Sequence, residues 1–355
     1  MRDEDDDPLE AGDADAEANE AEESAEDPLT YFRLLNSADV ASLIDIDALI
    51  DAMREALRQF STGAVQQPVR TVLPVGDRNW FGVMPAQLQS PAAIGAKLIT
   101  VFGRNADQGL PTHLGAVLLF SPHTGALVAM MDGRVLTESR TAAVSALSAQ
   151  VLARDDVEEM AIIGTGAQAR AHLLAMERVF DFKTVRVWSP TPVHPLNFVS
   201  EMTPHTEAEL VAAASPERAV HGAPLIVLAT SASEPVVQNE WIRSGAHIVS
   251  VGACRPDQRE LDPALIRRSR FYVDSRAAAL VESGDVVLGL AQGAFSASHI
   301  AGELGEVIAG TVEGRRSAAD ITIFKSLGLA VEDIAAADLV YRRAVQEQTG
   351  LELEL

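Results

Sequence analysis

Hydrophobic and polar residues follow two different patterns along the first half of the chain. Between residues 37 and 63 apolar positions recur at helical spacing, which predicts a short helix and a long one. Ser37 and Asp45 are the expected N-caps, and Gly63 is the expected stop. Five later segments alternate or run apolar between turn residues and are predicted strands: 66–75, 80–88, 92–102, 113–122 and 126–133. Their short connections predict a mostly antiparallel sheet.

The second half alternates strands with helical segments. An alanine-rich helix is predicted at 136–153, with Thr137 as its cap. Short strands are then predicted at 161–163, 184–187, 224–232, 247–253 and 270–275. This alternation is typical of a parallel sheet with helices on both faces. The final segment, 320–348, predicts a strand-like piece and a long helix that returns to the first domain.

A glycine-rich turn lies at the start of this second region. The sequence AIIGTGAQA, residues 161–169, joins a strand to a helix and approximates G-x-G-x-x-G/A. Gly164 permits the tight turn, Gly166 lets a pyrophosphate approach the backbone, and Ala169 keeps helix and strand close. A tight turn without a ligand is the alternative. The flanking strand and helix favour a dinucleotide site, in which the helix N-terminus faces the phosphates.

The strand that follows carries no acid at its end. Dinucleotide folds selective for NAD place Asp or Glu there, about 20 residues on, to bind the ribose 2′-hydroxyl. Here the strand 184–187 leads into Trp188, Ser189, Pro190 and Thr191. Without a carboxylate a 2′-phosphate is not repelled, so NADPH is favoured over NADH. No arginine follows the strand directly, so the preference is expected to be modest.

Charge and composition exclude several classes of protein. The net charge is −23, but residues 1–30 hold 14 acids and one arginine, which leaves −10 for the remainder. Residues 1–28 contain almost no large apolar residues and are expected to be a disordered acidic tail; the alternative is a docking arm for a basic partner. Neither part offers the basic surface that nucleic acid or an anionic membrane requires. With no signal sequence and one cysteine, a cytoplasmic location is expected.

Three cations lie in apolar or helical contexts of the first domain. They are Arg70, Lys97 and Arg140. Lysine inside an apolar strand is costly unless it is paired or faces a cavity, although a lysine at a strand edge is the commoner case. Three cations that converge on a cleft indicate an anion, and a carboxylate is the simplest one. His113 is either structural or a substrate contact, and the histidine spacing predicts no metal.

Several blocks of sequence resemble the ornithine cyclodeaminase/mu-crystallin family. They follow one another over nearly the whole chain after residue 35 and include QPVRTVLPV, AKLITVF, ESRTAAVSAL, GAHIVSVGACRPDQRELD and FKSLGLAVEDIAAADLVY. The resemblance implies an α/β protein: a Rossmann dinucleotide-binding domain, 154–314, inserted into an antiparallel-sheet α+β domain that binds substrate and forms a homodimer. That outer domain comprises 29–153 and is completed by 315–355.

The resemblance also implies roles for individual residues. Lys97, Arg70 and Arg140 match the family's catalytic and carboxylate-binding cations. His113, Cys254 and Leu327 match positions near the substrate. The cofactor side is implied for Thr141, Gly164, Thr165, Gly166, Ala167, Gln168, Ser189, Pro190, Thr191, Thr230 and Val251.

Two positions depart from family patterns. Cys254 occupies the place where cyclodeaminases and related alanine dehydrogenases carry an acid, and a thiol cannot replace that base at neutral pH without a much lowered pKa. Mu-crystallin-like members also lack the acid. Pro190 lies where those members have an arginine suited to a 2′-phosphate, which weakens the expectation of NADPH.

The expected activity is NAD(P)H-dependent reduction of cyclic imino acids, such as piperideine- or pyrroline-2-carboxylate. An ornithine cyclodeaminase or an alanine dehydrogenase is the enzymatic alternative, which Cys254 disfavours. A non-catalytic, nucleotide-dependent protein that binds small ligands is the alternative from another class. Three intact cations favour catalysis.

Overall fold

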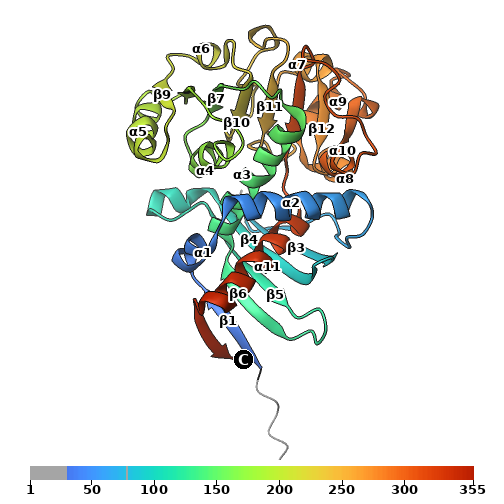
Figure 1. The fold of residues 1–355 in the computed structure, drawn as a ribbon. Coiled ribbons are helices and arrows are strands. Elements are labelled where there is room, and N and C mark those ends of the chain that lie inside the picture. The colour runs from blue at the N-terminus through green and yellow to red at the C-terminus, as the bar shows by residue number, and fades with distance from the viewer. Residues whose placement is uncertain (1–29, 77–78) are drawn as a thin grey trace, which may run out of the picture.

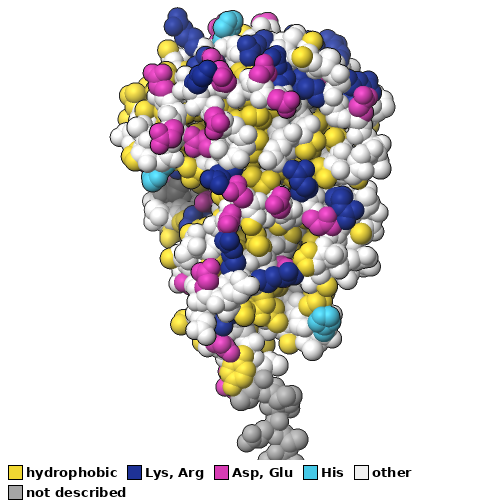
Figure 2. All heavy atoms as spheres, viewed as in Figure 1, with side chains coloured by type: hydrophobic (Ala, Val, Ile, Leu, Met, Phe, Trp, Pro, Cys, Tyr) yellow, Lys and Arg dark blue, Asp and Glu magenta, His cyan; other side chains and the backbone are white. Residues whose placement is uncertain are grey.

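The computed structural model describes residues 30–76 and 79–355, and its two domains lie one above the other (Figure 1). The predicted tail, residues 1–28, lies outside the described residues. Each domain is built on its own sheet, of seven and of eight strands. The α/β architecture with a dinucleotide-type domain is confirmed. On the face drawn in Figure 2, basic and acidic side chains are interspersed over both domains.

The seven-stranded sheet belongs to the first domain and has the order β15-β1-β6-β5-β4-β3-β2. All its pairs are antiparallel except β1 with β6. The strands are β1 (Tyr31–Leu35), β2 (Thr71–Pro74), β3 (Asn79–Gln89), β4 (Ala92–Phe102), β5 (His113–Phe120), β6 (Leu127–Asp132) and β15 (Leu351–Glu354). The helices of this domain are α1 (Ser37–Leu43), α2 (Ile46–Ser61), α3 (Gly133–Leu152) and α11 (Ala330–Glu347).

Helices α1, α2 and α3 begin at side-chain caps, two of which differ from the sequence prediction. Asp45 caps α2 as expected. Asn36, not Ser37, caps α1, because its side chain accepts from two backbone N–H groups and Asp39 completes a capping box. Asp132, not Thr137, caps α3, which begins earlier than predicted. Thr137 lies inside the helix and donates its hydroxyl to the carbonyl of Gly133.

The eight-stranded sheet is parallel throughout and has the order β13-β12-β14-β11-β10-β7-β8-β9. Its strands are β7 (Glu159–Ile163), β8 (Thr184–Trp188), β9 (Glu209–Ala212), β10 (Leu225–Leu228), β11 (His247–Ser250), β12 (Arg270–Val273), β13 (Ile300–Glu303) and β14 (Thr322–Lys325). Its helices are α4 (Ala167–Met176), α5 (Val193–Met202), α6 (Pro216–Val220), α7 (Pro263–Arg268), α8 (Arg276–Glu282), α9 (Gly284–Ala291) and α10 (Leu304–Ile308).

The C-terminal segment crosses between the domains. Strand β14 pairs with β11 and β12 inside the eight-stranded sheet. It therefore belongs to the dinucleotide-binding domain, although residues 315–355 are assigned to the outer domain from the sequence. Helix α11 follows directly and packs across β3 and β4 of the first domain (Figure 1). Residues 326–329 therefore link the two sheets, and this link is where the site is built.

Candidate active site

The glycine-rich turn has the geometry of a phosphate cradle. Gly164 has φ +116°, and a Cβ there would lie 2.3 Å from the carbonyl oxygen of Ala229, so only glycine fits. Gly166 has open space where a Cβ would be. Helix α4 begins at Ala167 without any side-chain cap on its N–H groups. The buried Oε1 atom of Gln168 has no hydrogen-bond partner among the described residues. Open space, free N–H groups and an unpartnered amide oxygen fit a bound dinucleotide.

The remaining residues expected on the cofactor side lie at the carboxyl ends of the parallel strands or beside them. Ser189, Pro190 and Thr191 follow β8, Thr230 follows β10, and Val251 follows β11, while Thr141 comes from α3. The Glu260 carboxylate holds Thr230, accepting from its backbone N–H at 2.7 Å and its hydroxyl at 2.8 Å. Its other oxygen accepts from the backbone N–H of Gly252 at 2.9 Å. The loops after β10 and β11 are thereby fixed at the edge of the crevice.

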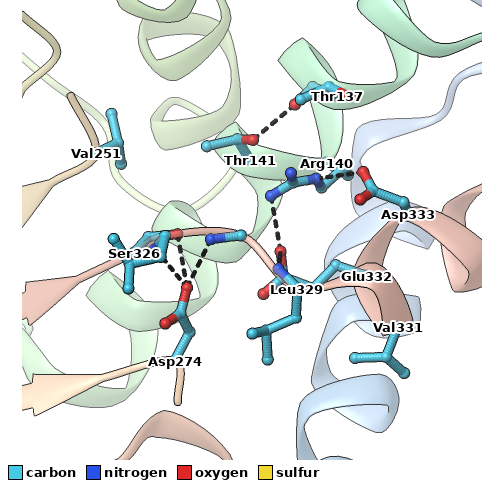
Figure 3. A network of polar contacts seen from close by, with 12 residues as sticks. Thr137, Arg140, Thr141, Val251, Asp274, Ser326, Leu329, Val331, Glu332 and Asp333 are labelled. Carbon is cyan, nitrogen blue, oxygen red and sulfur yellow. Dashed lines mark hydrogen bonds and ion pairs between the residues drawn. The ribbon is translucent and has the colours of Figure 1, made fainter. Parts of the chain in front are cut away.

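Lys97 and Arg140 meet at one buried carboxylate of α11. The Nζ atom of Lys97 lies 2.6 Å from Oδ2 of Asp333, and Nε of Arg140 lies 2.8 Å from its Oδ1. Arg140 also pairs through Nη1 with Glu332 at 2.7 Å (Figure 3). Lys97 is 2% exposed and Arg140 3%. Buried charges are tolerated only when they are paired in this way.

Arg70 joins the same site through the link between the sheets. Its Nη2 donates to the carbonyl oxygens of Leu327 and Gly328, each at 2.8 Å, and its Nε lies 3.0 Å from Oε2 of Glu282. Gly328 has φ +79°, and a Cβ there would lie 2.6 Å from the Arg140 guanidinium. The structure therefore brings the three predicted cations together around residues 327–333.

Asp274 fixes the link from below. It is fully buried at the end of β12, and its Oδ2 accepts from the backbone N–H groups of Leu327 and Gly328 (Figure 3). These hydrogen bonds hold the loop in place, although burial of the carboxylate outweighs them and raises the pKa of Asp274. The carbonyl groups that face Arg70 are held in place by this contact.

Burial shifts the pKa values of these groups, and neighbouring charges decide the outcome. Burial lowers the pKa of Lys97 to about 8, against the opposing effect of Asp333. Burial raises the pKa of Glu332 to about 7 although Arg140 opposes the shift. Burial also disfavours the charged form of Asp333, but Arg140 and Lys97 outweigh it and lower the pKa of that carboxyl. The site thus holds groups that can exchange a proton near neutral pH.

The other residues expected near the substrate, Leu327, Cys254 and His113, lie on three different segments of the chain. Leu327 is buried in the link. Cys254 follows β11, and its Sγ donates to the carbonyl oxygen of Val251 at 3.2 Å. Burial raises the pKa of the Cys254 thiol, so it is a neutral group and not the base that an acid would be there. His113 begins β5, exposed in the single chain, with Nδ1 3.0 Å from the hydroxyl of Thr112.

The acids that pair with the cations were not predicted from the sequence. They are Glu282, Glu332 and Asp333. A signal for two of them exists in the segment AVEDIAAA, where adjacent acids interrupt a run of small apolar residues at the start of a helix. Because the buried cations Lys97 and Arg140 require counter-charges, acids in apolar contexts are their expected partners.

Residues 30–76 and 79–355 contain no group of three or more His, Cys, Asp or Glu side chains arranged to hold a metal ion. None of their helices is long and apolar enough to cross a membrane.

The glycine-rich turn on a parallel sheet is typical of a dinucleotide-binding protein, and the cations gathered at the link between the two sheets are suited to an anionic ligand. The chain belongs to the ornithine cyclodeaminase/mu-crystallin family, whose model matches residues 32–348. It is 44% identical over 297 residues to the ketimine reductase mu-crystallin of Mus musculus, covering 82% of this chain and 91% of that one.

Solved structures give the same result for the fold. The Delta(1)-pyrroline-2-carboxylate reductase of Thermococcus litoralis, in complex with NADH and L-proline, has a TM-score of 0.88 at 36% identity and covers 90% of this chain and 99% of that one. An archaeal alanine dehydrogenase dimer with bound NAD has a TM-score of 0.87 at 32% identity, with 91% and 99% covered.

Proposed function

We propose that this protein is an NAD(P)H-dependent reductase of cyclic imino acids, such as piperideine- or pyrroline-2-carboxylate. The observation that carries the proposal is the meeting of Arg70, Arg140 and Lys97 around one buried link, next to a crevice that fits a dinucleotide. The names of the relatives support it, since they include a ketimine reductase and a pyrroline-2-carboxylate reductase.

The reaction divides between cofactor and protein. The nicotinamide, when bound, supplies the hydride for the C=N carbon. Arg70 and Arg140 bind and orient the substrate carboxylate, because guanidinium groups recognise carboxylates in a planar, two-point manner. Lys97 provides the proton for the imine nitrogen from Nζ, and Asp333 holds that ammonium in position. The surrounding buried groups exclude water from the reacting atoms.

The enzymatic alternatives share the fold but differ in what they require. Cyclodeamination of ornithine requires a base at the place of Cys254, and a neutral thiol does not serve. Cys254 also stands where alanine dehydrogenases carry an acid, which disfavours that activity. Alanine dehydrogenation is kept as the second candidate, because it uses the same hydride chemistry on an open-chain substrate and an archaeal alanine dehydrogenase is a structural neighbour. Burial lowers the pKa of Lys97 to about 8, which suits proton transfer and supports catalysis over ligand binding alone.

We further propose NADPH as the preferred cofactor, by a modest margin over NADH. The described end of β8 carries no acid to repel a 2′-phosphate, and Ser189 and Thr191 can donate to it. The relatives solved with NADH or NAD support a nicotinamide cofactor but not this preference. A cytoplasmic location stays a prediction from the sequence.

A homodimer through the first domain is proposed from one exposed sheet face. Residues that pair directly across antiparallel strands share a face, so Ile94, Leu114 and Met130 lie opposite the face of Lys97, which α11 covers. Each of the three is more than a third exposed in the single chain. An apolar sheet face of this kind marks an interface. The archaeal alanine dehydrogenase, solved as a dimer, supports the assembly.

One assay tests the activity. Oxidation of NADPH and of NADH is followed by absorbance with piperideine-2-carboxylate, with pyrroline-2-carboxylate, and with pyruvate plus ammonia. Ornithine is tested with oxidised cofactor by the release of ammonia, because cyclodeamination regenerates the cofactor and leaves its absorbance unchanged. We expect turnover with the cyclic imino acids and a kcat/KM about tenfold higher for NADPH, which is about 1.4 kcal/mol. Turnover of ornithine alone, or of no substrate, would contradict the proposal.

A further inference from the structure

The end of β8 lacks the side chain that would grip a 2′-phosphate strongly. Ser189, Pro190 and Thr191 lead into α5, and hydroxyl groups alone bind an anion more weakly than a charged donor does. A cation from a different element can fill this place. Arg170 is such a cation, because it lies in the first turn of α4, directly after the glycine-rich turn.

Three contacts fix the position of Arg170. Its Nη1 donates to the carbonyl oxygen of Thr165 at 2.5 Å, inside the glycine-rich turn. Its guanidinium lies 5.7 Å from the ring centroid of Phe198 in α5. Its Nε and Nη2 donate to the carboxylate of Glu201, also in α5, at 2.7 and 2.6 Å. The guanidinium therefore lies between the glycine-rich turn and α5, the helix into which the 189–191 loop leads. The turn itself is joined to the end of β8, because the N–H of Gly164 donates to the carbonyl of Trp188 at 2.8 Å.

The guanidinium still has hydrogen-bonding capacity in this position. Arginine has five N–H donors. Glu201 takes Nε at 2.7 Å and Nη2 at 2.6 Å, and Thr165 takes one N–H of Nη1. Within residues 30–76 and 79–355, the second N–H of Nη1 and that of Nη2 have no partner. These two lie on neighbouring nitrogens, which is the arrangement that binds phosphate oxygens in pairs.

We propose that Arg170 binds the 2′-phosphate of NADPH together with the 189–191 loop, and that Glu201 limits the strength of this contact. This inference rests on the proposed function, because it concerns the same cofactor. Glu201 and Phe198 orient the guanidinium in advance, which lowers the entropic cost of binding. The carboxylate of Glu201 also neutralises part of the arginine's charge. A modest preference for NADPH follows from both effects together.

Binding of two nucleotides to purified protein tests the proposal without any turnover. Isothermal titration calorimetry compares 2′,5′-ADP, which carries the 2′-phosphate, with 5′-ADP, which lacks it. In Arg170→Ala the affinity for 2′,5′-ADP should fall about tenfold or more, equivalent to about 1.4 kcal/mol. The affinity for 5′-ADP should stay within about twofold of wild type.

Arg178→Ala is the matched control, since Arg178 forms a surface ion pair with Asp47 and touches no part of the turn. It should change neither affinity. Glu201→Gln keeps a hydrogen-bonding side chain but removes the competing charge, so it should bind 2′,5′-ADP several-fold more tightly than wild type. This second variant also keeps Arg170 in place if Arg170→Ala is unstable.

The outcomes separate the possible roles. An equal loss of both affinities in Arg170→Ala would show that Arg170 only ties α4 to α5, and an unchanged affinity for 2′,5′-ADP would show that it does not reach the phosphate. Either result overturns the proposal, as does weaker binding of 2′,5′-ADP to Glu201→Gln. Failure of wild type to bind 5′-ADP would instead contradict the dinucleotide site itself, and with it the proposed function.

Discussion

Lys97 carries its charge in a place where burial opposes it. The side chain is 2% exposed, and one carboxylate, Asp333, lies 2.6 Å from Nζ. Because Lys97 lies on the substrate side and not on the glycine-rich turn, Lys97→Met should abolish turnover while the cofactor still binds. We expect kcat to fall far more than tenfold, a barrier increase above about 1.4 kcal/mol. Steady-state kinetics and calorimetry of NADPH binding measure the two effects.

The control for this variant is Lys183→Met, since Lys183 pairs with Glu158 on the surface. It should retain wild-type kcat. If Lys97→Met keeps more than about a tenth of wild-type kcat, equivalent to less than roughly 1.4 kcal/mol, then the proton does not come from Lys97.

The lowered pKa of Lys97 sets the direction of the pH dependence. Burial brings this pKa to about 8, so the ammonium that donates the proton is present below that pH and is lost above it. In the reductive direction kcat should therefore decline as pH rises through about 8. Lys97→Arg remains charged throughout and should show no decline there, whatever its absolute rate. The same decline in both proteins would assign it to another group.

At the scale of elements, α3 is held against the dinucleotide-binding domain by polar groups without charge. The Nε2 atom of His172, in α4, lies 2.8 Å from the hydroxyl of Ser145 in α3, and Nε2 of His247, in β11, lies 3.3 Å from the hydroxyl of Ser148 in the same helix. Burial lowers the pKa of His172 to about 4 and that of His247 to about 3. Both imidazoles are thus neutral in the folded protein at neutral pH.

These histidines predict a loss of stability in mild acid. His172 has a pKa of about 4 in the folded protein and one near 6.5 in the unfolded chain. Between these two pH values the unfolded chain binds a proton that the folded protein does not, so the free energy of unfolding falls as pH falls. For His172 the full loss is about 3 kcal/mol. His172→Gln keeps a hydrogen bond but cannot titrate, so it should lose less stability between pH 7 and 5, as measured by urea unfolding. Equal losses in both proteins would contradict the assignment.

The sequence predicted most elements because their patterns were local. The strand, turn and helix around Gly164 were recognisable from residue types that only that geometry requires. The strands β1, β9, β13 and β15 were missed. Strands β9, β13 and β15 lie at sheet edges and read ELVA, IAGE and LELE, which lack the apolar run of a central strand such as LIVL in β10. Residues 351–354 read LELE, and their role as a strand depends on pairing with β1.

The candidate site was predictable from its cations and not from its acids. Lys97 is conspicuous in the apolar strand AAIGAKLITVF. Glu332 and Asp333 lie in the first turn of a helix. Acids are common there because they interact favourably with the partial positive charge at the helix N-terminus, so their presence does not by itself indicate a site. Only the crossing of α11 over the sheet shows that these carboxylates are buried against Lys97 and Arg140.

At the scale of the whole molecule, α11 covers one face of the seven-stranded sheet and leaves the other face open. Ile94, Leu114 and Met130 lie on that face, and Ile94→Asp would place a charge on it. Because an interface core does not tolerate an unpaired carboxylate, this variant should be monomeric where wild type is a dimer. Leu196→Asp is the control, since Leu196 is 60% exposed on α5 of the other domain and should leave the dimer intact. Light scattering coupled to size-exclusion chromatography measures both masses. A dimer that persists in Ile94→Asp, or a wild type that is monomeric at micromolar concentration, would contradict the assembly through this face.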